Sequence, residues 1–141
     1  MPSGEACNFN YVYCYENHLQ KEKMGDKHVD AIFNLVKETN SKLTHIEYFG
    51  GEPLLNASFI IKLNNRLKEW SIENKKEFIA TATSNAYLLT PDIIDSLYSS
   101  NLLQYQITLD GLEYNHSKLR PLLNGKGTFD RIVNNLKYII S

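Results

Sequence analysis

The sequence predicts an α/β fold in which parallel strands alternate with helices. Three short runs rich in β-branched and aromatic residues each precede a segment whose apolar residues recur every three or four positions. The spacing between successive runs suits helical crossovers, and a parallel neighbour cannot be reached through a tight hairpin. With 43% hydrophobic residues the chain can build a core, so we expect one domain over residues 1–141.

The first predicted helix runs from about Asp26 to Ser41, and Asp26 is expected to cap it. Its apolar positions follow the i, i+3, i+4, i+7 spacing of one helix face and are Val29, Ile32, Phe33 and Val36. The first strand follows at Leu43–Phe49 and ends abruptly at a glycine pair, as a strand running into a loop does. Asn56 is expected to cap the next helix. The face that this helix should bury consists of Phe59, Ile60, Leu63, Leu67 and Trp70.

Two further strand-helix units complete the pattern. Glu77–Thr83 predicts the second strand, and Thr90-Pro91-Asp92 is typical of a helix start with a cap, a first-turn proline and a carboxylate suited to the helix dipole. Leu103–Leu109 predicts the third strand. The polar segment that follows, up to Gly127, is interpreted as turns, and Thr128 is expected to cap the last helix.

Composition and charge exclude several classes of partner. The net charge is -1, which offers no basic field for nucleic acid, and no apolar run approaches the roughly 20 residues that span a bilayer. The N-terminus lacks the basic and apolar regions of a secretion signal, so we expect a cytoplasmic protein. Cys7 and Cys14 should then remain reduced.

Polar residues follow all three predicted strands. They lie in Gly50-Gly51-Glu52, Ser84-Asn85 and Thr108–Asp110. Ligands of parallel α/β sheets bind at the carboxyl ends of the strands, so we expect these three loops to form one site.

Two motifs resemble those of a known family. Cys7-Asn-Phe-Asn-Tyr11-Val-Tyr-Cys14 is similar to the C-x-x-x-C-x-x-C cluster loop of radical S-adenosylmethionine (radical SAM) enzymes, with Tyr11 where the second cysteine belongs. The segment 48–56, YFGGEPLLN, resembles the glycine-rich segment that binds the methionine portion of that cofactor. Segments 84–91, 106–111, 116–121 and 124–130 particularly resemble peptide-modifying and anaerobic sulfatase-maturating (SPASM-type) members.

The resemblance implies a partial parallel (βα) barrel, about half of a (βα)6 core, with a 4Fe-4S cluster and S-adenosylmethionine. It implies reductive cleavage of that cofactor to a 5'-deoxyadenosyl radical, which abstracts hydrogen from a peptide or protein substrate. By motif position, Cys7 and Cys14 match the cluster ligands. The positions that match the cofactor-binding side are Gly50, Gly51, Glu52, Pro53, Asn85, Thr108, Asp110 and Arg120. Arg120 could make a charge-assisted bond to a carboxylate.

Tyr11 departs from the family pattern. A phenol is a harder and poorer iron ligand than a thiolate, so we predict weak or absent 4Fe-4S binding, and Tyr11→Cys should raise the occupancy. His18, a small thiol or another subunit could replace the missing ligand. Stable, stoichiometric 4Fe-4S in the isolated chain would contradict this prediction.

Length is a second departure, because three strands cannot close a six-unit barrel. We therefore expect an apolar inner face and open sheet edges, with self-association or dependence on missing sequence. Independent turnover is doubtful on this interpretation. The main alternative is a noncatalytic remnant that binds a nucleoside or a partner peptide, and a two-cysteine structural metal site ranks third because closed zinc sites need four ligands.

Simpler structural roles remain open at the predicted site. The glycine pair could only turn the chain, and Glu52 could be an ordinary solvated carboxylate. Asn85 and Asp110 could hydrogen-bond their own backbone in turns.

Overall fold

A computed structural model defines residues 1–14 and 22–140 and contains a three-stranded parallel sheet of order β1-β2-β3. The strands are β1 (Leu43–Tyr48), β2 (Glu77–Ser84) and β3 (Leu102–Ile107). The helices are α1 (Asp26–Thr39), the 3-10 turn η1 (Pro53–Asn56), α2 (Ala57–Glu73), α3 (Pro91–Ser99), α4 (Glu113–Leu119) and α5 (Phe129–Ile140). The predicted α/β class with parallel strands is confirmed.

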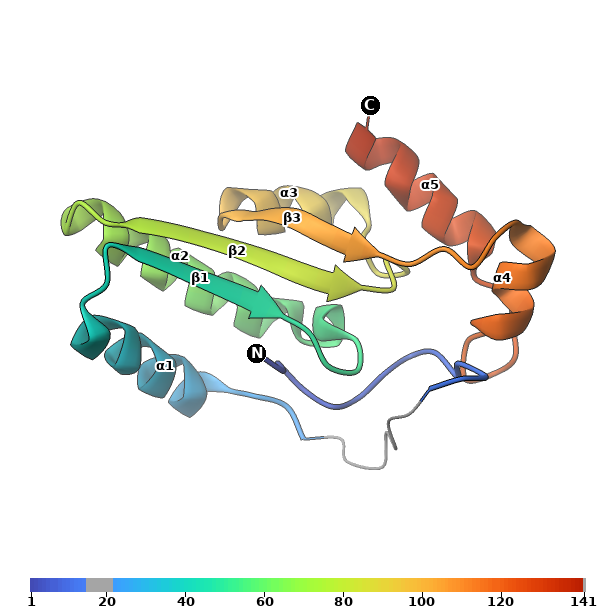
Figure 1. The fold of residues 1–141 in the computed structure, drawn as a ribbon, viewed down its shortest axis with the longest axis horizontal. Coiled ribbons are helices and arrows are strands. Elements are labelled where there is room, and N and C mark those ends of the chain that lie inside the picture. Colours follow the sequence, from blue (N-terminus) through green and yellow to red (C-terminus); the bar gives the residue numbers. More distant parts are fainter. Residues whose placement is uncertain (15–21, 141) are drawn as a thin grey trace.

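One face of the sheet carries the core. Alternate residues of β2 are buried, as the period of two requires, and α2 and α3 lie behind the sheet on that side (Figure 1). The fully buried side chains of α2, Ile60, Leu63 and Leu67, pack here, and α1 packs against the outer side of α2. Trp70, expected on the same buried face, is only half-buried and meets Phe33 of α1 edge-on.

The opposite face of the sheet is mostly polar, so the expectation of an apolar inner face is wrong. Its residues include His45, Glu47, Thr81, Thr83, Gln104 and Gln106, which line a shallow hollow of about 260 Å³. The physical reason is the strand alternation itself. The buried apolar residues of β1 and β2 point toward the helices, and the intervening positions are largely polar apart from Leu43 and Ile79.

Several element boundaries differ from the predictions. Gly25, not Asp26, is the N-cap of α1, and Asp26 lies in the first turn. β3 ends at Ile107, two residues earlier than expected. The predicted turn segment contains α4, whose one buried side chain is His116. Apolar periodicity could not reveal this helix because its buried position is a histidine and its Tyr114 is exposed.

The side chains predicted to cap helices at Asn56 and Thr90 make no hydrogen bond to the helix N-terminus. Asn56 is the residue before α2, but its side-chain amide donates to the carbonyls of Ser3 and Met24 instead of capping the helix. Thr90 precedes α3 without a side-chain cap bond. The Thr128 hydroxyl donates to the Arg120 carbonyl at 2.8 Å. These polar side chains join distant segments.

The N-terminal segment lies beside β1. Pro2 pairs in parallel with Phe49, and the Phe49 N–H donates to the Met1 carbonyl at 3.2 Å. An isolated parallel bridge therefore precedes the cysteine loop, which we define as residues 7–14. Figure 1 shows that this segment and α4 both reach the end of the sheet where the arrowheads point. None of the helices in residues 1–14 and 22–140 is long and apolar enough to cross a membrane.

Candidate functional site

Two of the three predicted loops, those after β1 and β2, meet directly at the carboxyl ends of the strands. The Glu52 N–H donates to the Ala6 carbonyl at 2.8 Å, which joins the loop after β1 to the N-terminal segment. The Asn85 side chain, in the loop after β2, donates to Oδ1 of Asn8 at 2.8 Å. The loops after β1 and β2 therefore both bind the segment that carries the cysteines.

The Glu52 carboxylate is the central buried charge of the site, with 3% of its surface exposed. Oε1 accepts from the Leu54 N–H at 3.0 Å and from the Ser84 hydroxyl at 2.9 Å, and Oε2 accepts from the Asn85 N–H at 2.8 Å. Burial raises the pKa of Glu52, while these donors act in the opposite direction. Glu52 is therefore a link between the loops after β1 and β2 and is not the solvated carboxylate of the simpler alternative.

Close backbone packing explains the glycine pair. Gly50 has φ +119°, which favours glycine, and a Cβ on Gly51 would lie 2.3 Å from the Ala6 carbonyl oxygen. Pro53 is buried, and its carbonyl accepts from the Ser3 hydroxyl at 3.3 Å. The loop of residues 50–53 is thus shaped to fit against residues 3–6.

The cysteine loop pairs with the segment after α4. The Asn10 N–H donates to the Pro121 carbonyl at 2.9 Å, and the Val12 N–H donates to the Leu119 carbonyl at 3.0 Å. Phe9 forms an antiparallel bridge with Leu122, and its side chain is fully buried. The backbone of the loop is therefore fixed by main-chain hydrogen bonds.

Arg120 connects that segment to the aromatic residues of the loop and is 6% exposed. Its guanidinium lies 4.3 Å from the centroid of the Tyr11 ring. The same group donates hydrogen bonds to the Tyr11 hydroxyl at 3.2 Å and to the Tyr13 hydroxyl at 2.7 Å. The Asp110 carboxylate lies 3.6 Å from the guanidinium and accepts from the Tyr13 hydroxyl. The Nε atom of Arg120 is buried and has no hydrogen-bond partner in the described part of the chain. This Nε–H could serve a carboxylate ligand.

Sequence reasoning missed His116 as a site residue. It is fully buried, its Nδ1 accepts from the Asp110 N–H at 3.2 Å, and its carbonyl accepts from the Arg120 N–H at 2.8 Å. Burial, followed by the nearby Arg120 charge, lowers its pKa. The signal in the sequence was its position in the matched segment 116–121. Thr108, by contrast, is exposed just beyond β3.

The described donor set does not fit a 4Fe-4S cluster. Cys7 and Cys14 are both free cysteines, which gives two sulfur ligands where the family pattern has three, and burial raises the pKa of Cys7. Burial also raises the pKa of Tyr11, whose hydroxyl already bonds to Arg120. Within residues 1–14 and 22–140, no group of three His, Cys, Asp or Glu side chains is placed to hold a metal ion. His18 lies outside the described residues.

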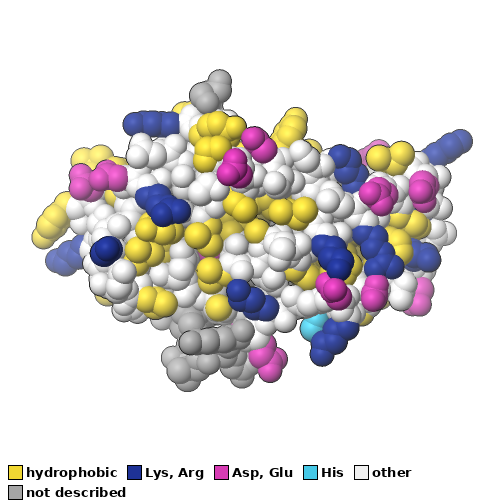
Figure 2. Space-filling model, turned by 180° about the vertical axis from the view of Figure 1, so that it is seen from behind, with side chains coloured by type: hydrophobic (Ala, Val, Ile, Leu, Met, Phe, Trp, Pro, Cys, Tyr) yellow, Lys and Arg dark blue, Asp and Glu magenta, His cyan; other side chains and the backbone are white. Residues whose placement is uncertain are grey.

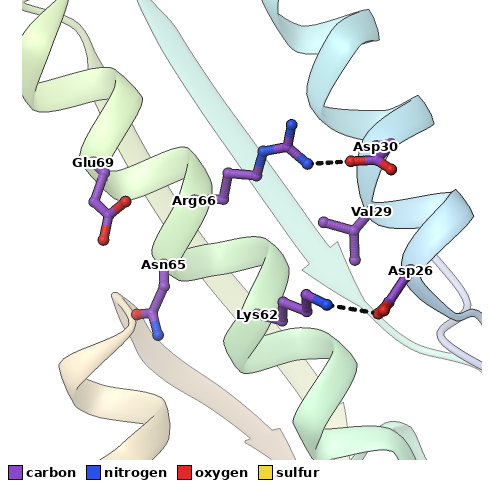
Figure 3. Close-up of a pocket in the computed structure, with 7 residues that line it drawn as sticks. All are labelled: Asp26, Val29, Asp30, Lys62, Asn65, Arg66 and Glu69. Carbon is purple, nitrogen blue, oxygen red and sulfur yellow. Dashed lines mark hydrogen bonds and ion pairs between the residues drawn. The ribbon is translucent and has the colours of Figure 1, made fainter.

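A larger hollow lies between α1 and α2, remote from this site. Figure 3 shows its walls, where Lys62 pairs with Asp26 at 2.8 Å and Arg66 pairs with Asp30. These two pairs neutralise each other's charges and are well exposed, so they contribute little to holding a ligand. Figure 2 shows charges of both signs interspersed over this helical side. We do not consider the α1–α2 hollow a functional site.

Comparison with known proteins agrees with the motif resemblance. A family model described as the Radical SAM superfamily matches residues 1–141. An uncharacterized protein of Methanocaldococcus jannaschii is 32% identical over 121 residues, covering 85% of this chain and 40% of the relative. The cysteine-type anaerobic sulfatase-maturating enzyme of Clostridium novyi is 26% identical over 146 residues, covering 98% of this chain and 38% of the relative.

Solved structures share the fold. The enzyme anSMEcpe with bound AdoMet and Cp18Cys peptide superposes with a TM-score of 0.85 at 21% identity, covering 99% of this chain and 38% of that one. The same enzyme with AdoMet and Kp18Cys peptide gives a TM-score of 0.86 at 20% identity, with the same coverage. The chain thus spans about two fifths of the length of these relatives.

Proposed function

The chain belongs to the radical SAM superfamily, and we propose that it keeps the S-adenosylmethionine site of that family without a complete cluster site. The observation that carries the proposal is the meeting of the residue 50–53 loop with residues 3–6, and of Asn85 and Arg120 with the cysteine loop that follows, at one end of a parallel sheet. This rim is where parallel α/β sheets bind ligands. The fold shared with AdoMet-bound structures supports the proposal.

In this proposal the residues that hold the cofactor are Gly50, Gly51, Glu52, Pro53, Asn85, Thr108, Asp110 and Arg120. Glu52 acts by shaping the loop of residues 50–53, because both of its oxygens already accept protein donors. Arg120 supplies positive charge and a buried Nε–H for the methionine carboxylate. In the family, the bound cofactor supplies a 5'-deoxyadenosyl radical for hydrogen abstraction.

The proposed parent reaction acts on a peptide or protein, with residues 1–141 supplying part of a radical SAM core domain. Two structures with the same fold contain peptides, which supports this substrate class. The polar inner face adds hydrogen-bonding groups such as Thr83 and Gln106 next to the rim. Turnover by the isolated chain should be impaired because only two thiols are available for a cluster.

Calorimetric titration with S-adenosylmethionine tests the proposed site. Arg120→Gln should weaken binding about 10-fold or more, the value of a charge-assisted hydrogen bond, while binding of methylthioadenosine, which lacks the carboxylate, should change little. Arg66→Gln is the matched control, because Arg66 lies over the Phe33 ring at 4.1 Å but does so between α1 and α2, away from the rim. Absence of S-adenosylmethionine binding at millimolar concentration by a folded chain would refute the proposal.

Tyr11 favours the alternative of a noncatalytic remnant. Analysis for 5'-deoxyadenosine distinguishes this alternative from an active enzyme. Binding of S-adenosylmethionine without 5'-deoxyadenosine under strong reductant would favour a nucleoside-binding remnant. Production of 5'-deoxyadenosine would favour an enzyme. Anaerobic reconstitution with iron and sulfide analysis should find less than one 4Fe-4S per chain, and stoichiometric stable cluster would contradict this.

A further inference from the structure

We propose that the contact between Tyr11 and Arg120 holds the cysteine loop against residues 119–123 without iron. Tyr11 would then replace the structural role of a cluster, and it would also deprive that cluster of a thiolate ligand. This inference concerns the order of the loop, and it stands whether or not the chain binds S-adenosylmethionine. It begins from the mismatch at position 11, where an aromatic ring occupies the place of a thiolate ligand.

The loop is docked by groups that involve no metal. Main-chain bonds join Asn10 to Pro121 and Val12 to Leu119, and the Leu123 N–H donates to the Asn8 carbonyl at 3.2 Å. The outer part of the loop is exposed, with Val12 at 71%, whereas Cys7 and Phe9 are buried. Exposed main-chain bonds open more readily than buried ones, so a side-chain contact at Tyr11 would strengthen the hold on this outer part.

Arg120 is firmly held on the opposite side of the contact. Its N–H donates to the His116 carbonyl at 2.8 Å, and its carbonyl accepts from the Thr128 hydroxyl at 2.8 Å. Its backbone is therefore fixed between α4 and α5. A guanidinium extended from this position can anchor whatever it touches in the loop.

Tyr11 provides two features that a cysteine lacks. Its ring offers a face to the guanidinium at 4.3 Å, and its hydroxyl accepts from the same group at 3.2 Å. The ring also stacks on Tyr13 with centroids 6.1 Å apart and meets buried Phe9 edge-on at 5.4 Å. A cation over a desolvated ring is a favourable contact that needs no cofactor. Tyr11 thus links Arg120 to the buried end of the loop.

Hydrogen exchange at the Asn10 and Val12 amides tests the inference, with the β2 amides of Ala80 and Ala82 as an internal reference for the fold. In the wild type, protection of the loop amides should be the same with an iron chelator and after iron and sulfide are added. Tyr11→Leu and Arg120→Met should each speed exchange of the loop amides at least 10-fold and leave the reference amides slow. Tyr11→Phe should have a smaller effect because it keeps the ring.

Tyr11→Cys provides the sharpest comparison. It removes the ring and hydroxyl that Arg120 contacts and supplies a third thiol. Protection of the loop amides from hydrogen exchange should therefore fall in the apo protein and should return only with iron and sulfide. Arg66→Met, which breaks a similar contact with Phe33 between α1 and α2, should leave loop exchange unchanged. The inference is overturned if chelator exposes the wild-type loop, or if Tyr11→Leu and Arg120→Met leave its protection intact while the reference amides confirm folding.

Discussion

At the residue scale, Glu52 shows how one buried charge can organise a site. Its carboxylate accepts two backbone N–H groups and one hydroxyl from the loops after β1 and β2. A buried carboxylate is costly unless such donors surround it. These three hydrogen bonds explain why a glutamate can be buried at the rim even without a ligand.

Glu52→Ala should therefore destabilise the fold. It leaves the Leu54 and Asn85 N–H groups and the Ser84 hydroxyl without their acceptor, and we expect a loss of about 3 kcal/mol in the free energy of unfolding. Urea unfolding measures the change. Glu69→Ala, at an exposed position of α2, is the control and should change stability by less than about 0.5 kcal/mol. Equal effects of the two substitutions would contradict the role of Glu52.

His116 should give the stability a pH dependence below neutrality. Its pKa in the folded protein is lowered from 6.5, mainly by burial, so the unfolded chain binds the proton more tightly. Its contribution to stability is full above pH 6.5 and is lost as the pH falls toward the lowered pKa, with a slope of at most about 1.4 kcal/mol per pH unit. Protonation would also remove the Nδ1 acceptor of the Asp110 N–H.

Urea unfolding at a series of pH values checks this dependence. His116→Gln keeps an acceptor but cannot titrate, so its stability should vary less between pH 4.5 and 6.5 than that of the wild type. His45→Gln, at an exposed position of β1, should retain the wild-type dependence. Parallel curves for the wild type and His116→Gln would refute the assignment.

At the element scale, the loop of residues 50–53 depends on the absence of side-chain atoms. Gly51 lets the loop approach the carbonyls of Glu5 and Ala6, and the neighbouring Glu52 N–H bonds to Ala6. A turn alone would not require this approach. The glycine therefore joins two loops of the rim.

Gly51→Ala should lower the free energy of unfolding by about 1–3 kcal/mol, because its Cβ would overlap the Ala6 carbonyl. Gly25→Ala is the comparison, since no atom lies within 4 Å of a Cβ there and only the N-cap preference for glycine over alanine is lost. Denaturant unfolding of both variants measures the difference. A Gly51→Ala protein as stable as Gly25→Ala would show that the loops are not packed as described.

At the scale of the whole molecule, the free edge of the sheet is the surface best suited to self-association. The inner face is polar, whereas the β3 edge adjoins a groove of about 510 Å³ lined by Tyr98, Leu103, Tyr138 and Ile139. Tyr98 is 68% and Leu103 is 48% exposed. Open edges beside apolar surface favour pairing with another chain.

Sedimentation should therefore show association that rises with protein concentration and that Leu103→Lys reduces, since a lysine on an edge strand opposes pairing. Leu35→Lys, at an exposed position of α1, should leave association unchanged. A wild-type chain that remains monomeric at high concentration would contradict the expected self-association.

The sequence by itself determined the order of the three strands and of the helices other than α4, the polar loops at the strand ends and the tyrosine in the cluster motif. These features depend on local periodicity and motif spacing, which are written in neighbouring residues. The tertiary structure decided the rest: the polar inner face, the hydrogen bonds that Glu52 accepts, the burial of His116 beside Asp110 and the contact of the Arg120 guanidinium with the Tyr11 ring. Tyr11 and Arg120 are 109 positions apart in the sequence. Local patterns cannot relate residues at such a separation, because only folding brings their side chains within hydrogen-bonding distance.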